Sequence, residues 1–257
     1  MEEVKQPTFG IYIPSYKRAK SCTAHRFLQY GTYIVRASEE AEYREALRDV
    51  EDHIKVWAVE DELICGLTEV NQWLIDNAPE DVIAILDDDI HHFYYRMYET
   101  VSLEDPEVVT AELERIGQLM SDLKIGFGAT DATIRPWNYD CEFSFKGCAG
   151  AVRWVNRPVF KAKCHKELEY NYDLDLVLQE LLVNRVILKP KYFCSKGLTD
   201  TNEGGASGKK RGDQVASINL MKSKWGKYFS YHGELRLLHP RNPYAEDRQQ
   251  WQPECQH

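Results

Sequence analysis

Three consecutive acidic residues, Asp87, Asp88 and Asp89, are the side chains best placed to do chemistry in this sequence. They follow Asp81–Leu86 (DVIAIL), an apolar run typical of a strand that is buried on both faces of a parallel sheet. Gathered carboxylates repel one another unless a cation or a helix end compensates them. Since alternate residues of a strand share a face, we expect Asp87 and Asp89 to point together and Asp88 to point away. Such a pair favours Mn²⁺ or Mg²⁺ bridging a diphosphate, and the alternative is an acidic surface turn.

The segments before the triplet alternate between strand and helix patterns. Apolar and β-branched runs predict strands over Thr8–Pro14, Thr32–Ala37, His53–Val59 and Asp81–Leu86. Helical spacing predicts helices over Ala41–Val50 and Leu67–Ile75. Such βαβ units predict a doubly wound α/β half that binds ligands beyond the carboxyl ends of its strands. The segments at those ends are all polar or charged: Pro14–Arg18, Arg36–Glu39, Glu60–Glu62 and Asp87–Asp89.

The segments after the triplet are more irregular. Strands are expected over Phe93–Tyr98, Gly126–Pro136, Ala149–Phe160, Ile187–Cys194 and Glu234–Leu238. Helices are expected over Glu107–Leu123, Tyr172–Val186 and Asp213–Tyr228. Because no repeat or low-complexity linker interrupts the chain, we predict one domain over residues 1–257, with lobes at 1–100 and 101–257.

Charge is distributed unevenly along the chain, whose formal net charge is −9. Between Lys146 and Lys227 there are 16 Lys and Arg against 8 Asp and Glu, whereas the remainder has 16 against 33. An acidic first part followed by a basic second part is expected if the second part meets a polyanion such as DNA. A solvated basic face without a partner is the alternative.

A glycine-rich loop in the second part suits an anion. Its glycines let the backbone approach phosphate, and Lys209, Lys210 and Arg211 supply charge. The following helix adds three lysines interleaved with aromatic residues, an arrangement suited to stacking on an unpaired base. These residues are Lys222, Lys224, Lys227, Trp225, Tyr228 and Phe229. The alternative is a surface loop and a helix whose aromatic side chains face the core.

The order of three segments resembles a known family. IYIPSYKRA at 11–19, AILDDDI at 84–90 and NYDLDLVLQELL at 171–182 look like the nucleotide-binding half, the DxD motif and the later acidic helix of a GT-A glycosyltransferase. The resemblance covers most of the chain and implies a GT-A-like, Rossmann-type α/β fold with a mostly parallel sheet. It also implies a nucleotide-sugar-binding lobe at 1–100 and a smaller mixed acceptor lobe at 101–257. A nucleotidyltransferase usually carries a glycine-rich phosphate loop after its first strand, and this chain has none there.

The resemblance assigns roles to individual residues. Asp173 corresponds to the acceptor base of inverting members, and Asp175 is a supporting acid. Asp87 and Asp89 would bind the metal and Asp87 and Asp88 the donor, while a C-terminal histidine completes the metal site in many members. His232 is preferred here over His239. At the donor end we expect contacts from Pro14, Ser15, Tyr16, Arg18 and Glu39, with Lys209, Lys210 and Arg211 closing over the diphosphate; Trp57 and Asn71 are weaker candidates.

Within GT-A enzymes, the pattern most resembles the TET/JBP-associated glycosyltransferases of bacteriophage DNA hypermodification. That resemblance rests on the compact size, the loop GGASGKKRGD and the helix KSKWGKYF. It implies transfer of a hexose or pentose from a UDP-sugar to 5-hydroxymethylcytosine or another hydroxymethylpyrimidine in DNA. The alternatives are a saccharide, lipid or protein acceptor, or a non-catalytic sugar-nucleotide-binding protein.

The remaining composition bounds where the protein works. No apolar run approaches the roughly 20 residues that span a bilayer. The acidic start lacks the features of a signal peptide, and seven cysteines without a pairing pattern indicate reduced thiols. We therefore expect the cytoplasm, which is the host cytoplasm if the protein is phage-encoded, and no membrane partner.

Overall fold

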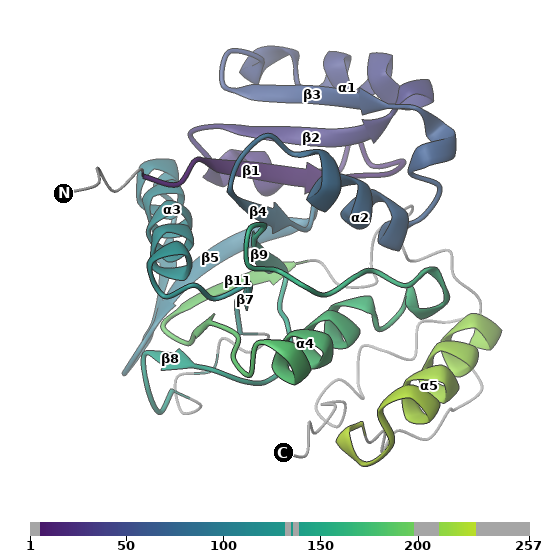
Figure 1. Cartoon of the computed structure of the whole chain (residues 1–257). Helices are drawn as coiled ribbons and strands as arrows, with labels where there is room; N and C mark the ends of the chain where they lie inside the picture. The colour runs from purple at the N-terminus through teal and green to yellow at the C-terminus, as the bar shows by residue number, and fades with distance from the viewer. Residues whose placement is uncertain (1–5, 132–134, 136–138, 198–210, 230–257) are drawn as a thin grey trace.

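The computed structural model describes residues 6–131, 135, 139–197 and 211–229, of which 211–213 are described by their backbone alone. In this part of the chain a six-stranded sheet has the order β3-β2-β1-β4-β9-β7 (Figure 1). Its strands are β1 (Phe9–Pro14), β2 (Gly31–Arg36), β3 (Ile54–Val59), β4 (Val82–Leu86), β7 (Phe127–Ala129) and β9 (Val152–Asn156). The first four run parallel, and β9 runs antiparallel to both of its neighbours, β4 and β7.

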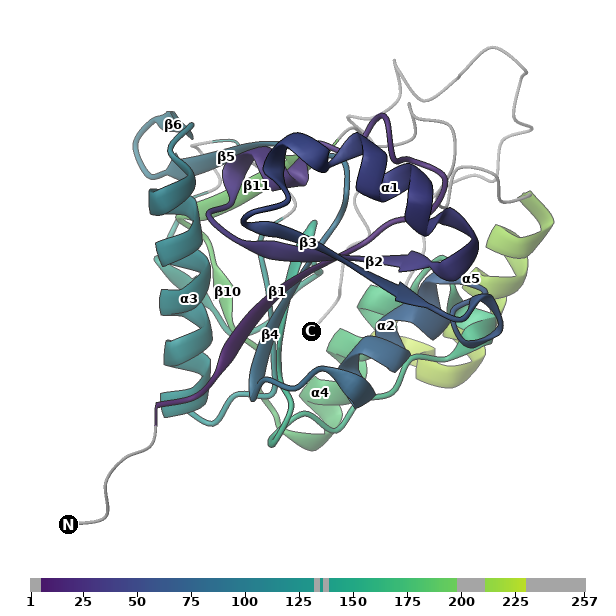
Figure 2. The same cartoon turned by 90° about the horizontal axis from the view of Figure 1, so that it is seen from above.

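Helices cover both faces of this sheet, as the view from above shows (Figure 2). The helices that pack on it are α1 (Glu40–Ala46), α2 (Leu67–Asn77), α3 (Pro106–Asp122) and α4 (Tyr172–Val183), and α5 (Arg211–Trp225) packs against α4. Alternate residues of β1 point to opposite faces, so Ile11 packs with α1 and α3 whereas Tyr12 packs with α2 and α4. β4 is buried at all five positions, which explains its unbroken apolar sequence.

Smaller sheets extend the second half of the chain. β5 (Ile90–Arg96) lies between β6 (Thr100–Leu103) and β11 (Phe193–Gly197), and β8 (Phe143–Ser144) pairs with β10 (Lys189–Pro190). Because β9 and β7 complete the main sheet, that sheet takes strands from both sides of residue 100. The division into two functional lobes at that residue remains a prediction.

The strands and helices expected before residue 90 are all present, with bounds that differ by a few residues. Three expectations for the second half were wrong in detail. The strand predicted over Ile187–Cys194 is divided between β10 and β11 with a break at Lys191 and Tyr192, the strand predicted over Gly126–Pro136 ends at Ala129, and β6 was not predicted. The predicted strand Glu234–Leu238 lies outside the described residues.

A third apolar cluster holds α5 against α4. Ile218, Met221 and Phe229 pack there with Leu168 and Leu174. The fully buried Asp175 accepts hydrogen bonds from the Trp225 indole at 2.7 Å and from Lys224 Nζ at 2.9 Å. Two residues of the predicted base-stacking surface therefore bind an acid of α4. Asp175 serves the packing of α5 in this structure.

Removing this acid should loosen α5 and leave the sheet intact. Asp175→Ala leaves the Trp225 indole and Lys224 without their buried acceptor, and we expect it to lower the free energy of unfolding by about 2 kcal/mol. Amide hydrogen exchange should accelerate in α5 and not in β4. Asp76→Ala, an exposed acid bonded to Gln72, is the matched control. Unchanged protection of α5 in Asp175→Ala would contradict this role.

Candidate active site

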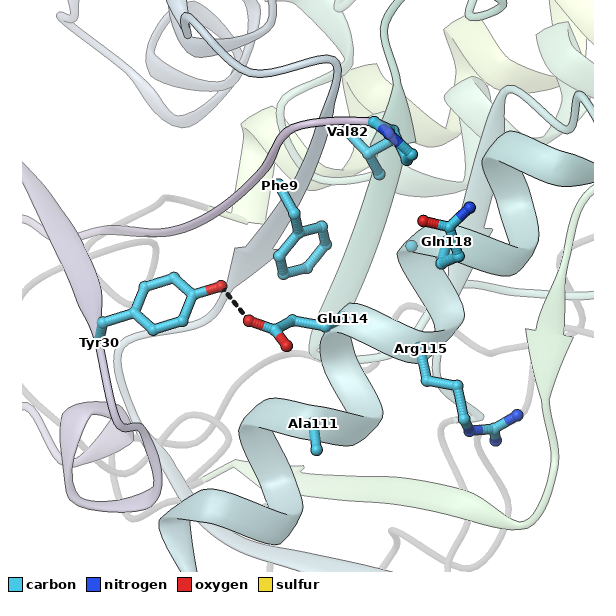
Figure 3. A pocket seen from close by; sticks show the side chains of 9 residues that line it. Phe9, Tyr30, Val82, Ala111, Glu114, Arg115 and Gln118 are labelled. Carbon is cyan, nitrogen blue, oxygen red and sulfur yellow. Dashed lines mark hydrogen bonds between the residues drawn. The ribbon is translucent and has the colours of Figure 1, made fainter. Parts of the chain in front are cut away.

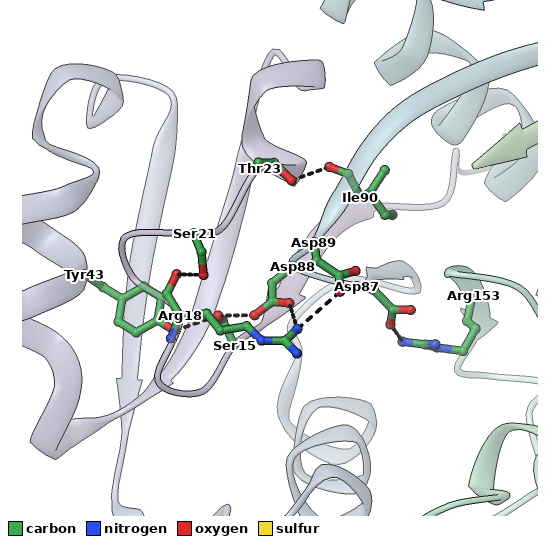
Figure 4. A network of polar contacts seen from close by, with 10 residues as sticks. All are labelled: Ser15, Arg18, Ser21, Thr23, Tyr43, Asp87, Asp88, Asp89, Ile90 and Arg153. Atoms are coloured by element: carbon green, nitrogen blue, oxygen red, sulfur yellow. Dashed lines mark hydrogen bonds and ion pairs between the residues drawn. The ribbon is translucent and has the colours of Figure 1, made fainter. Parts of the chain in front are cut away.

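The acidic triplet lies in the turn between β4 and β5, at the carboxyl edge of the sheet (Figure 4). The Asp87 amide donates to the carbonyl of Ala151 at 3.0 Å, and the Asp88 carbonyl accepts from the Thr23 amide at 2.9 Å. β4 ends at Leu86, before the first acid, so the chain is not an extended strand here. The expectation that Asp88 points away from a shared Asp87–Asp89 face, derived from strand geometry, is therefore wrong, and each carboxylate has its own surroundings.

The buried Asp88 links the end of β4 to the end of β1. Its Oδ2 accepts a hydrogen bond from Ser15 Oγ, and its Oδ1 lies 2.8 Å from Arg18 Nη1. Burial raises the pKa of Asp88, and the Arg18 charge and the two hydrogen bonds oppose that shift. Both carboxylate oxygens of Asp88 are thus engaged by protein groups, which fixes the loop after β1 against the turn.

Asp89 is more buried than Asp87, the first acid of the triplet. Its side chain is 13% exposed, and its Oδ2 is 3.4 Å from Arg18 Nη1. Burial, followed by the charges of Asp87 and Asp88, raises its pKa to about 6. The opposite wall is Gly197 of β11, where a Cβ would lie 2.8 Å from Asp89 Oδ1. A side chain at position 197 would therefore displace the Asp89 carboxylate.

Asp87 is the most open acid of the three, with 43% of its side chain exposed. Its Oδ1 accepts from Arg153 Nη2 at 2.8 Å, and the Arg153 guanidinium lies 5.6 Å from the ring of Tyr172. Asp173, the first acid of α4, is close enough for its charge to act on Arg153. Burial raises the pKa of Asp173, and Arg153 opposes that rise. The structure therefore places the predicted base beside the triplet.

The charge of this cluster favours a divalent cation. With all six groups ionised, four carboxylates (Asp87, Asp88, Asp89 and Asp173) and two guanidinium groups (Arg18 and Arg153) carry a formal net charge of −2. Within the described part of the chain, no three His, Cys, Asp or Glu side chains converge as a metal cage. Mg²⁺-type ions commonly take one or two carboxylates and complete their shell with phosphate oxygens and water. The exposed Asp87 and the partly buried Asp89, with surplus negative charge, fit that coordination.

The loop after β1 presents the predicted donor residues at the same edge. Lys17 has φ 56° and donates its amide to Glu39 Oε2 at 2.9 Å, so Glu39 contacts the loop from the end of β2. Tyr16 stacks on the Arg36 guanidinium at 4.1 Å. Pro14, Ser15, Tyr16, Arg18 and Glu39 thus lie together at the ends of β1 and β2. Their contacts with a donor remain a prediction.

Two residues that contact this loop were not among the predicted site residues. Tyr43 of α1 lies with its hydroxyl 2.6 Å from Ser15 Oγ and accepts from the Arg18 amide, and neither contact has a local sequence signal. Arg36, the stacking partner of Tyr16, was noted only as a strand end. Of the weaker donor candidates, Trp57 packs against Trp73 at 4.9 Å, and the buried Asn71 donates to the carbonyl of Leu67. Both have packing roles.

Several predicted site residues cannot be placed. Lys209, Lys210, His232 and His239 lie outside the described residues, and Arg211 begins α5 without a described side chain.

Lys222 and Lys227 are exposed near the end of α5, and Tyr228 is 54% exposed just after it. His91 and His92 follow the triplet on β5 with ring centroids 4.8 Å apart.

A separate cavity of about 510 Å³ lies away from the acids (Figure 3). It is bordered by Phe9 and Val82, which begin β1 and β4 at the edge of the sheet opposite the acids, and by Glu114 of α3. Glu114 accepts from the Tyr30 hydroxyl at 2.6 Å across one side of it. Ligands of doubly wound sheets bind at the carboxyl ends of the strands, so this cavity is not part of the acidic site.

The comparisons with known proteins identify the fold. No protein-family model matches the sequence, and no curated protein matches it. Solved structures do match, among them GalNAc-T7 with UDP, GalNAc and Mn²⁺, with a TM-score of 0.53 and 10% identity. That match covers 88% of this chain and 49% of the GalNAc-T7 chain, so this chain spans about half the length of that relative.

Two further structures agree. The mannosyltransferase PcManGT from Pyrobaculum calidifontis with GDP-Man and Mn²⁺ has a TM-score of 0.51 and 11% identity, covering 73% of this chain and 56% of that one. Glucosyl-3-phosphoglycerate synthase from Mycobacterium tuberculosis with Mn²⁺, UDP-glucose and phosphoglyceric acid has a TM-score of 0.50 and 9% identity, covering 84% and 79%. The predicted fold class is confirmed: the chain has the α/β fold of GT-A glycosyltransferases, with a mainly parallel six-stranded sheet.

A search of the described helices for a membrane-spanning segment found none that is both long and apolar enough.

One half-buried histidine beside the triplet should make stability depend on pH. His25 lies in the short helix Ala24–Phe27, and the Ala24 amide donates to the Asp88 carbonyl. Burial lowers the pKa of His25 to about 4, below its value of about 6.5 in an unfolded chain. The folded state therefore favours the neutral ring, and its contribution to stability is complete above pH 6.5 and is lost as the pH falls toward 4.

We expect the thermal midpoint of the wild type to fall between pH 7.5 and pH 4.5 more steeply than that of His25→Gln. His165→Gln, an exposed histidine, should follow the wild type. Parallel curves for the wild type and His25→Gln would show that His25 does not titrate in this range.

Proposed function

We propose that the protein is a metal-dependent glycosyltransferase that uses a nucleotide-sugar donor. The observation that carries this proposal is the surplus of two negative charges at the turn after β4, formed by four carboxylates and two guanidinium groups at the carboxyl edge of a GT-A sheet. Asp87 and Asp89 would hold Mn²⁺ or Mg²⁺, with a histidine such as His232 as a further candidate ligand. All three structures described above contain Mn²⁺ together with a nucleotide or nucleotide-sugar.

The donor is proposed to be a UDP-sugar, bound along the loop after β1. The ring of Tyr16 is held by Arg36 at the edge of the sheet, where it could contact the base, and Glu39 is near enough to meet the ribose. Arg18 lies between Asp88 and Asp89 and carries positive charge toward the diphosphate position. The transferred sugar is proposed to be a hexose or a pentose.

Bound metal would neutralise the charge that develops on the nucleotide diphosphate as the glycosidic bond breaks. The chain's own residues would then prepare the acceptor. Asp173 is proposed to accept the proton of the acceptor hydroxyl, which activates that oxygen for attack on the anomeric carbon. A single displacement of this kind inverts the anomeric centre. Asp173 suits this role because it is adjacent to Arg153 and Asp87 and is not the acid that anchors α5.

The acceptor is proposed to be a 5-hydroxymethylpyrimidine in DNA, 5-hydroxymethylcytosine first among them. Support comes from the basic composition of residues 146–227 and from the exposed Lys222, Lys227 and Tyr228 at the end of α5. The immobilisation of Lys224 and Trp225 against Asp175 reduces the surface available to a base. A saccharide, lipid or protein acceptor is the alternative, because it needs no basic surface. A binding protein without turnover is the alternative outside enzymes.

Turnover of a UDP-sugar should require both the metal and the acids. With Mn²⁺ and a panel of radiolabelled UDP-sugars, we expect hydrolysis or transfer by the wild type and loss of at least 100-fold in Asp89→Ala. Asp173→Asn should lower kcat to a similar degree while UDP binding is retained, since it removes the base and leaves the donor site. Asp76→Ala, an exposed acid near the end of α2, is the control. UDP binding without any turnover by the wild type would favour the binding-protein alternative.

Salt dependence should identify the acceptor. If DNA is the acceptor, transfer to hydroxymethylated oligonucleotides should weaken steeply between 50 and 200 mM salt, because several phosphate contacts release counterions. Lys222→Glu with Lys227→Glu should reduce this transfer about tenfold without changing UDP binding. Absence of DNA binding at low salt, together with transfer to a saccharide, would reject the DNA acceptor and leave the glycosyltransferase proposal standing.

A further inference from the structure

Arg153 is a buried cation in direct contact with the most exposed acid of the site. It lies on β9, whose antiparallel pairing with β4 places Arg153 opposite Ile85, two residues before Asp87. Its side chain is 7% exposed, whereas that of Asp87 is 43% exposed. The guanidinium is therefore enclosed by the fold, and the carboxylate it holds still faces the solvent from which a metal ion and a donor must arrive.

The guanidinium is incompletely hydrogen-bonded. Its Nη2 donates to Asp87, but its Nε is buried and has no hydrogen-bond partner among the described residues. A buried donor without an acceptor is costly, so this geometry is not the one that would serve Arg153 best as a purely structural residue. The ring of Tyr172, 5.6 Å from the guanidinium, attracts the cation but does not supply a hydrogen-bond acceptor for Nε.

A fixed positive charge beside Asp87 opposes the binding of a second cation there. Asp87 Oδ1 is engaged by Arg153, so a metal ion would use the other oxygen and lie within a few ångströms of the guanidinium. Repulsion acts on both charges of a divalent ion, and it is little screened because Arg153 is buried. Arg153 also orients Asp87, which favours metal binding. This effect concerns one short side chain and is smaller than the repulsion.

We propose that Arg153 competes with the metal ion for the carboxylate of Asp87. This competition keeps the affinity for the free divalent cation low, and it couples metal binding to the arrival of the nucleotide diphosphate. The diphosphate brings negative charge that offsets the guanidinium, so metal and donor bind best together. This inference rests on the proposed function, because it takes Asp87 as a metal ligand. Arg153 is a positioning residue in this scheme: it acts on the metal and on Asp173 through their charges.

Titration with Mn²⁺, followed by the electron paramagnetic resonance signal of the free ion, tests the competition without any turnover. In the absence of nucleotide, Arg153→Gln should bind Mn²⁺ about tenfold more tightly than the wild type, because the amide can still donate to Asp87 but carries no charge. Arg153→Met should change in the same direction. Arg153→Lys keeps the charge and should stay within about threefold of the wild type.

The same variants should lose cooperation between metal and donor. With saturating UDP, the wild type should gain much more Mn²⁺ affinity than Arg153→Gln gains, so their affinities converge. Arg115→Gln, a half-exposed arginine of α3 paired with Glu112, is the matched control and should behave as the wild type. Thermal unfolding establishes that each variant is folded. If Arg153→Met does not fold, Arg153→Gln and Arg153→Lys provide the test.

The outcomes separate the two proposals. Equal or weaker Mn²⁺ binding by Arg153→Gln, in a protein whose wild type binds Mn²⁺ with UDP, overturns the competition and leaves the metal-dependent donor site intact. Failure of the wild type to bind Mn²⁺ even with UDP overturns the proposed function, and the competition with it. Tighter binding in the neutral variants together with unchanged binding in Arg153→Lys supports a role of charge that packing alone would not produce.

Discussion

Repulsion between carboxylates at the end of a buried strand is the constraint on which this site depends. Asp87, Asp88 and Asp89 leave β4 within one turn, and desolvation makes the ionised forms of Asp88 and Asp89 costly. The fold compensates them from two sides, with Arg18 from the loop after β1 and Arg153 from β9. The compensation is partial, and the residual charge is what makes the edge of the sheet chemically distinct from the rest of the surface.

The order of the strands explains how such distant segments meet. β1, β4 and β9 are neighbours in the sheet, so the loop after β1, the acidic turn and Arg153 lie side by side although up to 138 positions of sequence separate Ser15 from Arg153. The antiparallel direction of β9 matters as much as its place. It directs the chain so that Arg153 lies near the carboxyl end of β4, and α4 then begins with Asp173 close to the same point.

The sequence predicted the first half of the fold closely because unbroken apolar runs are specific for buried parallel strands; β1 and β4 each begin one residue later than expected. It did not predict the site's internal contacts. Arg153 lies in VRWVN, where one basic residue among apolar ones has no distinguishing pattern, and its partner Asp87 is 66 residues away. The contact of Asp175 with Trp225 was not predicted for the same reason, since it depends on how α5 packs.

The close approach of β11 to the acidic turn has a consequence for how this protein can vary. A Cβ at position 197 would lie 2.8 Å from Asp89 Oδ1, and the strand pairing shifts register here, between Lys196 and Gly197. Any side chain at this position would therefore displace the Asp89 carboxylate from its place beside Arg18. The setting of one acid of the triplet thus depends on a residue of another strand that carries no side chain.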